Sequence, residues 1–239
     1  VVFTVRQGQQ IVVDHVLVVG NSRTRTATIE RELQFKPGDA LAGGTVVEVP
    51  GAVNNDFKIT PQQLEKAITP NTAAFIINSP SNPCGTMYSP DELAVLAKVI
   101  AKHEQITVIT DEIYEKLIYS DVPHFSLASL PELAERTITI NGVSKAYCMS
   151  GWRVGYTCAP GNGGVIAKAM GKLQGQMTSN ITSFVYPAIV NALQNGAESV
   201  EKMRQVFAQR ATLIHKLVSG LPGIKCPRPT GAFYVFPDV

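Results

Sequence analysis

The residues best suited to chemistry in this chain are Lys145 and Arg153, which stand eight positions apart after an apolar run at residues 137–140. A lysine at the exit of a buried strand is partly stripped of water, and this favours a neutral, nucleophilic amine. An arginine offers a planar cation that binds phosphate oxygens in a fixed geometry. An amine nucleophile beside a phosphate clamp is what a pyridoxal 5′-phosphate site requires.

Two other polar segments follow predicted strands. Asp111 and Tyr114 come directly after residues 106–110, and Asn82 lies in the proline-stiffened loop at residues 78–85. A carboxylate beside a pyridine nitrogen favours the protonated ring, and Tyr114 could hydrogen-bond the phenolic oxygen of such a ring. Because the following proline restricts the backbone of Asn82, its amide can be aimed at an oxygen. Each segment alone could be an ordinary polar loop, but together they favour a site.

The order of predicted elements explains how these segments meet. Apolar strands are predicted at residues 45–49, 73–77, 106–110 and 136–140, and helices at residues 60–68, 89–102 and, as a short crossover, 126–135. Apolar strands that alternate with helices indicate a parallel sheet covered on both faces. The sequence therefore predicts an α/β fold, a three-layer α/β/α arrangement with a mostly parallel sheet. Ligands in such sheets bind at the carboxyl ends of the strands.

The two ends of the chain carry weaker signals. Residues 16–19 look like a strand and residues 26–35 like a helix, and residues 20–24 between them could form a phosphate cup, although an ordinary capped loop explains them better. After Pro160 we expect a helical stretch over about 165–194, an amphipathic helix over 198–218 and two short strand-like pieces within 224–239. The predicted domains are a large domain, residues 1–197, and the start of a small C-terminal domain, residues 198–239.

Composition narrows the class of protein. The chain has 239 residues, 45% of them hydrophobic, and a net charge of +2, which gives no electrostatic case for nucleic acid or an anionic membrane as partner. No apolar run reaches about 18 residues, so no membrane span is predicted. The four cysteines show neither Cys-x-x-Cys pairing nor histidines at ligand spacing. We therefore expect no metal site and a cytoplasmic protein with reduced thiols.

One motif is too specific to be an accident. Gly-Trp-Arg-x-Gly, at residues 151–155, has a chance of about 10⁻³ in a chain of this size. Together with the other motifs it resembles the class I aminotransferases, the aspartate aminotransferase family of fold type I pyridoxal-phosphate enzymes. The match extends from about residue 35 to 238 and includes Asn-x-Pro-x-Asn-Pro-x-Gly at 78–85, Asp-x-x-Tyr at 111–114, Ser-Lys at 144–145 and Gly-Ala-Phe-Tyr-x-Phe at 231–236.

The resemblance implies transamination between an aspartate-like α-amino acid and a 2-oxo acid. Lys145 would carry the cofactor as a Schiff base and shuttle the α-proton, while Asp111 would pair with the pyridinium. A lyase, racemase or decarboxylase built on the same residues stays open, because the fold fixes the cofactor better than the reaction. A shortened, catalytically impaired cofactor-binding protein stays open as well.

By the same resemblance, Tyr114 and Asn82 would contact the phenolic oxygen, and Arg153, assisted by Ser144, would bind the phosphate. The chain departs from the family pattern in two places. Between residues 37–39 and 42–44 it has two residues where the family has a strand and a helix with a ring-stacking aromatic. It also ends before the segment whose arginine grips the substrate carboxylate. The resemblance therefore supports cofactor binding better than substrate binding. We also expect a homodimer that is weakened by a missing N-terminal arm.

Overall fold

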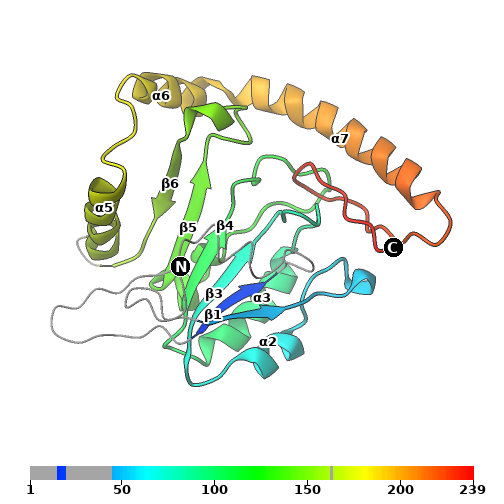
Figure 1. Cartoon of the computed structure of the whole chain (residues 1–239), viewed down its shortest axis with the longest axis horizontal. Coiled ribbons are helices and arrows are strands. Elements are labelled where there is room, and N and C mark those ends of the chain that lie inside the picture. The colour runs from blue at the N-terminus through cyan, green and yellow to red at the C-terminus, as the bar shows by residue number, and fades with distance from the viewer. Residues whose placement is uncertain (1–14, 20–44, 162–163) are drawn as a thin grey trace.

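The computed structural model describes residues 15–19, 45–161 and 164–239. Within these ranges six strands form one sheet in the order β2-β1-β3-β4-β5-β6 (Figure 1). The strands are β1 (His15–Val19), β2 (Thr45–Val49), β3 (Thr72–Asn78), β4 (Thr107–Asp111), β5 (Thr137–Gly142) and β6 (Gly155–Cys158). Neighbouring strands are parallel except β5 and β6. The predicted α/β fold with a mostly parallel sheet is confirmed, with β6 as an antiparallel edge strand.

Helices α2 (Pro61–Ala67) and α3 (Pro90–Ala101) begin where the sequence has a capping residue followed by proline. The Thr60 hydroxyl accepts from the Gln63 N–H, and the Gln63 side chain accepts from the Thr60 N–H. Ser89 and Glu92 make the same reciprocal pair at the start of α3. These bonds satisfy N–H groups that have no partner inside a helix, so both helices start at a defined residue.

The main core lies between one face of the sheet and helices α2, α3 and α4 (Pro131–Ala134). Phe75 and Ile77 are two positions apart on β3 and therefore point to the same face, where Val108 of β4 joins them. The helices contribute fully buried side chains to this layer, namely Leu64, Leu96, Ile100 and Leu133. Burial on this scale makes the central strands a rigid platform for the residues at their ends.

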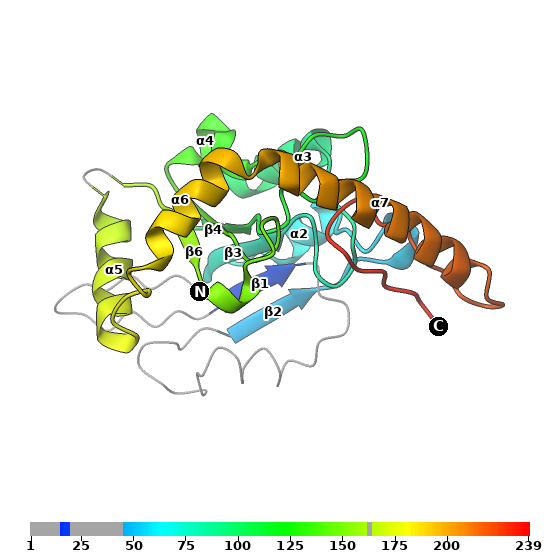
Figure 2. The same ribbon diagram turned by 90° about the horizontal axis from the view of Figure 1, so that it is seen from above.

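The second half of the chain forms three helices, α5 (Val165–Met177), α6 (Val185–Asn195) and α7 (Ala197–Ser219). Figures 1 and 2 show α6 and α7 following one another along one end of the sheet. The single helical stretch predicted over 165–194 is wrong, because residues 178–184 separate two helices. Ser179 has a φ of 64°, which leaves the α-helical region and ends the first helix before it.

Helix α7 matches the predicted amphipathic helix, but its apolar side chains have two different surroundings. Val200 is buried, and Met203 and Phe207 pack against residues that follow β4. Leu213 and Leu217, further along the helix, are 58% and 59% exposed. Only the first half of the apolar stripe therefore packs against the described part of the chain.

The C-terminal residues pair less than expected. Single bridges join Ile118 to Gly231 and Lys225 to Asp238, so the two predicted strand-like pieces at 224–239 are isolated bridges rather than strands. The short helices η1 (Val53–Asn55), η2 (Leu127–Ser129) and η3 (Ser150–Trp152) complete the elements. No helix in the described ranges is long and apolar enough to cross a membrane.

Several predictions concern other parts of the chain. Those for residues 20–24 and 26–35, and the departure from the family pattern at 37–44, lie outside the described residues. The predicted domain boundary falls at the start of α7, and the division into two domains stays a prediction.

Candidate active site

Strand register brings two of the predicted segments together at the carboxyl edge of the sheet. Asn78, the last residue of β3, is paired with Asp111, the last residue of β4, and Asp111 lies beside Ile140 of β5. The Asn78 amide and the Ser79 N–H donate to the Asp111 carbonyl at 2.9 and 3.2 Å. The Glu112 N–H donates to the Ile140 carbonyl at 2.9 Å. These bonds fix the end of β4 between its two neighbours.

The strand ends open into a pocket of about 610 Å³, a size usual for small-molecule sites. All six residues predicted to contact the cofactor line it, namely Asn82, Asp111, Tyr114, Ser144, Lys145 and Arg153. Asn78, Asn141 and Ser150 also line it, although the sequence alone indicates no individual role for any of them. The pocket thus combines an amine, a carboxyl group, a guanidinium and several amides from separate crossovers.

Asp111 presents to this pocket a carboxyl group whose negative charge is unfavourable. Burial raises the pKa of Asp111, the Ile113 N–H works in the opposite direction, Glu112 raises it further and the Lys145 amine lowers it. The Ile113 N–H donates to Asp111 Oδ1 at 3.0 Å. A cation bound next to the carboxyl group would therefore be favoured by the electrostatics of the site.

The Lys145 amine lies against two aromatic rings. Its Nζ is 5.5 Å from the centre of the Tyr114 ring and 5.6 Å from that of Phe233, within the range of cation–π contacts. Burial raises the pKa of the Tyr114 hydroxyl well above its usual range, and a hydrogen bond with Tyr234 adds to this effect. Tyr114 therefore keeps its proton and can act as a hydrogen-bond donor.

Arg153 lies at the end of η3, with φ 55° and ψ 46° in the left-handed region. Its Nη1 donates to the Ser150 carbonyl at 2.9 Å, and the Ser150 hydroxyl donates to the Ser144 carbonyl at 2.9 Å. A guanidinium has five N–H donors, so this bond orients the exposed side chain and leaves donors for an anion. Arg153 and Ser144 are thereby linked on the same wall of the pocket.

Residues 230–234, far away in the sequence, pack against the loop that carries Asn82. The N–H groups of Thr230 and Gly231 donate to the Gly85 carbonyl at 2.8 and 3.0 Å. A Cβ on Gly85, whose φ is 69°, would stand 2.2 Å from the Tyr234 carbonyl oxygen, so only glycine allows this approach. Tyr234 belongs to the Gly-Ala-Phe-Tyr-x-Phe motif, but nothing local in the sequence indicates its contact with Tyr114, 120 positions away.

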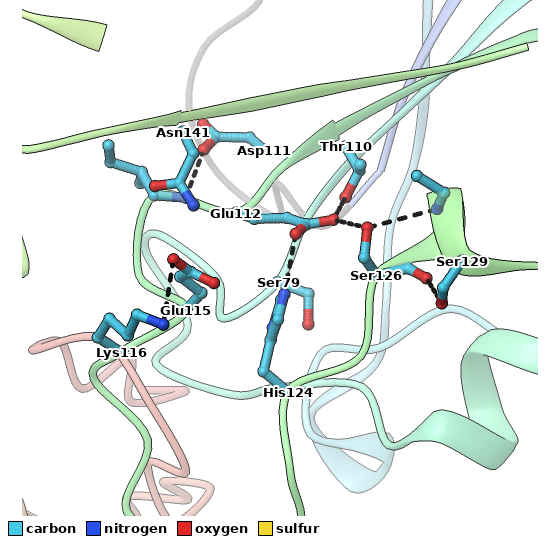
Figure 3. Close-up of polar contacts among 12 residues, drawn as sticks. Ser79, Thr110, Asp111, Glu112, Glu115, Lys116, His124, Ser126, Ser129 and Asn141 are labelled. Carbon is cyan, nitrogen blue, oxygen red and sulfur yellow. Dashed lines mark hydrogen bonds and ion pairs between the residues drawn. The ribbon is translucent and has the colours of Figure 1, made fainter. Parts of the chain in front are cut away.

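Glu112 is a second residue whose role the sequence alone does not indicate. It follows Asp111 directly and is buried. Its Oε1 accepts from the hydroxyls of Thr110 at 3.1 Å and Ser126 at 2.6 Å, and its Oε2 lies 2.9 Å from His124 Nε2 (Figure 3). An acidic residue next to a strand-end aspartate in an apolar segment is the only local signal. The sequence around its partners His124 and Ser126, 12 and 14 positions further along the chain, gives no sign of these contacts.

Fold and pocket define a class of protein, an α/β protein with a lysine, a carboxyl group and an arginine around a ligand site at the carboxyl edge of its sheet. The family follows from the sequence as a whole. A family model described as aminotransferase class I and II matches residues 34–239, and the chain belongs to this family. The aspartate aminotransferases of this family use pyridoxal 5′-phosphate.

Curated relatives are aspartate aminotransferases. The chain is 49% identical over 199 residues to the aspartate aminotransferase of Geobacillus stearothermophilus, covering 83% of this chain and 50% of that protein. It is 45% identical over 200 residues to an aspartate/prephenate aminotransferase of Cereibacter sphaeroides, covering 83% of this chain and 49% of that protein. The chain thus spans about half the length of the curated relatives it matches.

Solved structures agree in fold. An aromatic aminotransferase from Pyrococcus horikoshii is 36% identical, with a TM-score of 0.83 and coverage of 95% of this chain and 57% of that one. A mutant aspartate aminotransferase of Thermus thermophilus is 36% identical, with a TM-score of 0.81 and coverage of 94% and 58%. The described architecture is therefore that of the aminotransferase fold.

Proposed function

We propose that this chain forms the cofactor-binding part of an aminotransferase that moves an amino group between an aspartate-like α-amino acid and a 2-oxo acid. The observation that carries the proposal is the meeting of Asp111, Lys145 and Arg153 around one pocket. Similarity to aspartate aminotransferases supports the choice of reaction and substrate.

The residues of the pocket fit pyridoxal phosphate in charge. Burial and Glu112 make the negative charge of Asp111 unfavourable, and a protonated ring nitrogen would supply the missing cation. Arg153, with Ser144 beside it, would bind the phosphate through guanidinium and hydroxyl donors. Asn82 and Tyr114, which line the same pocket, would supply the donors for the phenolic oxygen.

Lys145 would have two roles in this reaction. Pyridoxal phosphate supplies an aldehyde that bonds covalently to amines and a ring that withdraws electrons from the α-carbon of the amino acid. At rest, Lys145 Nζ would hold the cofactor covalently. Once the amino acid has taken its place, the released Lys145 amine would remove the α-proton as a general base.

Asp111 would act throughout by keeping a proton on the ring nitrogen. Its position is set by backbone and amide bonds from both neighbouring strands, so little reorganisation is needed when charge develops in the pocket. The rings of Tyr114 and Phe233 hold the Lys145 amine beside them through cation–π contacts.

Reconstitution tests the cofactor assignment. Purified chain mixed with pyridoxal phosphate should develop a visible absorption band, and borohydride should convert it into a pyridoxyl adduct on the peptide that contains Lys145. Lys145→Ala should lose both signals. Lys116→Ala is the matched control, because Lys116 lies close in sequence to Tyr114 but pairs with Glu115 at 3.7 Å outside the pocket lining. An adduct elsewhere in the wild-type chain would refute the role of Lys145.

Product analysis tests the reaction. With aspartate and 2-oxoglutarate, the loaded chain should form glutamate. Alanine or pyruvate without glutamate would instead favour a decarboxylase or lyase on the same residues. A stable adduct without any product would favour a cofactor-binding protein of impaired activity.

We also propose that the protein acts in the cytoplasm and as a homodimer. All four cysteines lie in the described ranges and none of them is in a disulfide, as expected in a reducing compartment. On α5, Val165 and Met177 are 66% and 68% exposed, and apolar surface of this kind is common at subunit interfaces. Sedimentation analysis of the purified chain would separate a dimer from a monomer.

A further inference from the structure

The hydroxyl groups of Tyr114 and Tyr234 form a close pair. Their oxygens are 2.6 Å apart, and either can be the donor. The two rings meet edge to face, with centres 5.7 Å apart at 83°. Tyr114 is buried and Tyr234 partly so. A hydrogen bond of this length between two shielded phenols is strong and directional.

Counting donors and acceptors assigns a direction to this bond once the cofactor is present. A phenol has one proton and two lone pairs. In the free chain the Asn82 side chain lowers the pKa of the Tyr114 hydroxyl, as a donor does, whereas the bond with Tyr234 raises it, as an acceptor does. A stronger acceptor that takes the Tyr114 proton would reverse the bond with Tyr234, since either hydroxyl can be its donor. If Asn82 and Tyr234 both donate to the Tyr114 oxygen, both lone pairs are used. The single proton of Tyr114 is then left for a third group in the pocket.

We propose that Tyr234 is a positioning residue that donates to the Tyr114 hydroxyl and thereby directs the Tyr114 proton to the phenolic oxygen of the cofactor. This inference rests on the proposed function, since it assigns Tyr114 to that oxygen. An anionic phenolic oxygen can only accept, so Tyr114 must donate to it and must receive its other bonds from donors. Tyr234 has a proton to give, whereas phenylalanine at this position would leave one lone pair of Tyr114 unused.

The segment that carries Tyr234 is fastened independently of this hydroxyl. The Ala232 N–H donates to the Leu117 carbonyl at 2.9 Å, and the Tyr119 N–H donates to the Thr230 carbonyl at 2.8 Å. The Tyr119 hydroxyl donates to the Ala232 carbonyl. Removing one oxygen from Tyr234 therefore leaves its ring in place, so Tyr234→Phe tests the hydroxyl rather than the docking of residues 230–234.

The chain offers a matched control in Tyr119→Phe. This variant also removes one phenol oxygen that is bonded to the same segment, but its partner is the Ala232 carbonyl rather than Tyr114. A general loosening of residues 230–234 would affect both variants, whereas a role at the Tyr114 hydroxyl would appear only in Tyr234→Phe.

The first measurement needs no cofactor. Urea midpoints are compared for the wild-type chain, Tyr114→Phe, Tyr234→Phe and the double variant. If the hydroxyls are paired, the double variant should have nearly the midpoint of the less stable single variant. Additive shifts would overturn the pairing, whatever the chain does with pyridoxal phosphate.

The second measurement uses the chain loaded with pyridoxal phosphate. A donor on the phenolic oxygen stabilises the more negative, deprotonated form of the bound chromophore, so losing the donation from Tyr234 should raise the pH midpoint of the visible band. The expected rise in Tyr234→Phe is roughly half a pH unit, from a hydrogen bond of ordinary strength. Tyr119→Phe should keep the wild-type midpoint. A change shared by both variants, or none in Tyr234→Phe, would overturn the proposal.

The two measurements also separate this inference from the proposed function. Suppose that the urea midpoints show coupled hydroxyls but the wild-type chain develops no visible band with pyridoxal phosphate. That result would refute the cofactor site, and with it the role given to Tyr234. The hydroxyls could instead be coupled and the visible band present, with a pH midpoint that is the same in wild type and Tyr234→Phe. That result would refute the role of Tyr234 alone.

Discussion

The two carboxyl groups at the end of β4, Asp111 and Glu112, are neighbours in the chain but have opposite surroundings. Glu112 is enclosed by three side chains that hydrogen-bond it, those of Thr110, His124 and Ser126. The Asp111 carboxyl group lines the pocket, with the Ile113 N–H bonded to one oxygen. One carboxyl group is built into the protein, and the other faces the space where a ligand would bind.

This difference separates stability from function at adjacent positions. A buried carboxylate that receives several hydrogen bonds holds its partners in place, and removing it strands them. A buried carboxyl group that faces a pocket carries a penalty for its charge, which protonation or a cationic ligand relieves. The Glu112 cluster ties residues 124–126 to the end of β4 (Figure 3). It thereby supports the backbone from which Asp111 projects.

The largest expected effect comes from removing the enclosed carboxyl group. Glu112→Ala leaves two hydroxyls and an imidazole without their shared partner, so the chain should lose about 2–4 kcal/mol of unfolding free energy. Urea denaturation measures this loss. Glu115→Ala is the control, because Glu115 pairs with Lys116 near the surface at 3.7 Å and should change stability by less than about 0.5 kcal/mol. Equal losses in the two variants would contradict the comparison.

Asp111 shows what the sequence could predict and why. An aspartate directly after an apolar strand, with further polar segments after neighbouring strands, places the site at the carboxyl edge from periodicity and topology alone. The parallel register then puts Asn78 beside Asp111, as that reasoning requires. Four strands and the capped starts of α2 and α3 follow from equally local signals, namely apolar runs and Ser or Thr before proline.

The contacts of Glu112 and Tyr234 could not be predicted in this way. Each depends on where a distant loop comes to lie, and nothing in the local sequence distinguishes His124 or Tyr234 from a surface residue. The break between α5 and α6 is another case, because a left-handed Ser179 has no unambiguous signal. Local chemistry located the pocket, whereas long-range packing decides which residues surround and support it.

A smaller effect is expected from His124, the partner of one Glu112 oxygen. His124→Ala removes the contact at 2.9 Å but leaves the two hydroxyls on the other oxygen, so the loss should be about 1 kcal/mol. His124→Gln can still donate from its amide and should recover part of the difference in urea midpoint. If both substitutions cost as much as Glu112→Ala, the cluster acts through packing rather than through hydrogen bonds to the carboxyl group.

The smallest change in unfolding free energy is expected from Asp111→Asn, and it is a gain rather than a loss. The folded pKa of Asp111 is raised above its ordinary value of 3.8, so the folded chain binds this proton more readily than the unfolded chain. The penalty is present above the folded pKa and disappears as the pH falls through it. Without cofactor, Asp111→Asn should therefore be more stable than wild type by about 0.5 kcal/mol near neutral pH. This advantage should fade as the pH is lowered towards about 4.

The measurement is the difference in urea midpoint between Asp111→Asn and wild type, followed from neutral to acid pH, so that other carboxyl groups cancel. The same variant should lose roughly a hundredfold or more in transamination by the loaded chain, because an amide cannot keep the ring nitrogen protonated. A variant that is less stable at neutral pH, or a difference that does not change with pH, would mean that the Asp111 carboxyl group supports the fold as Glu112 does. The contrast between the two neighbours would then be lost.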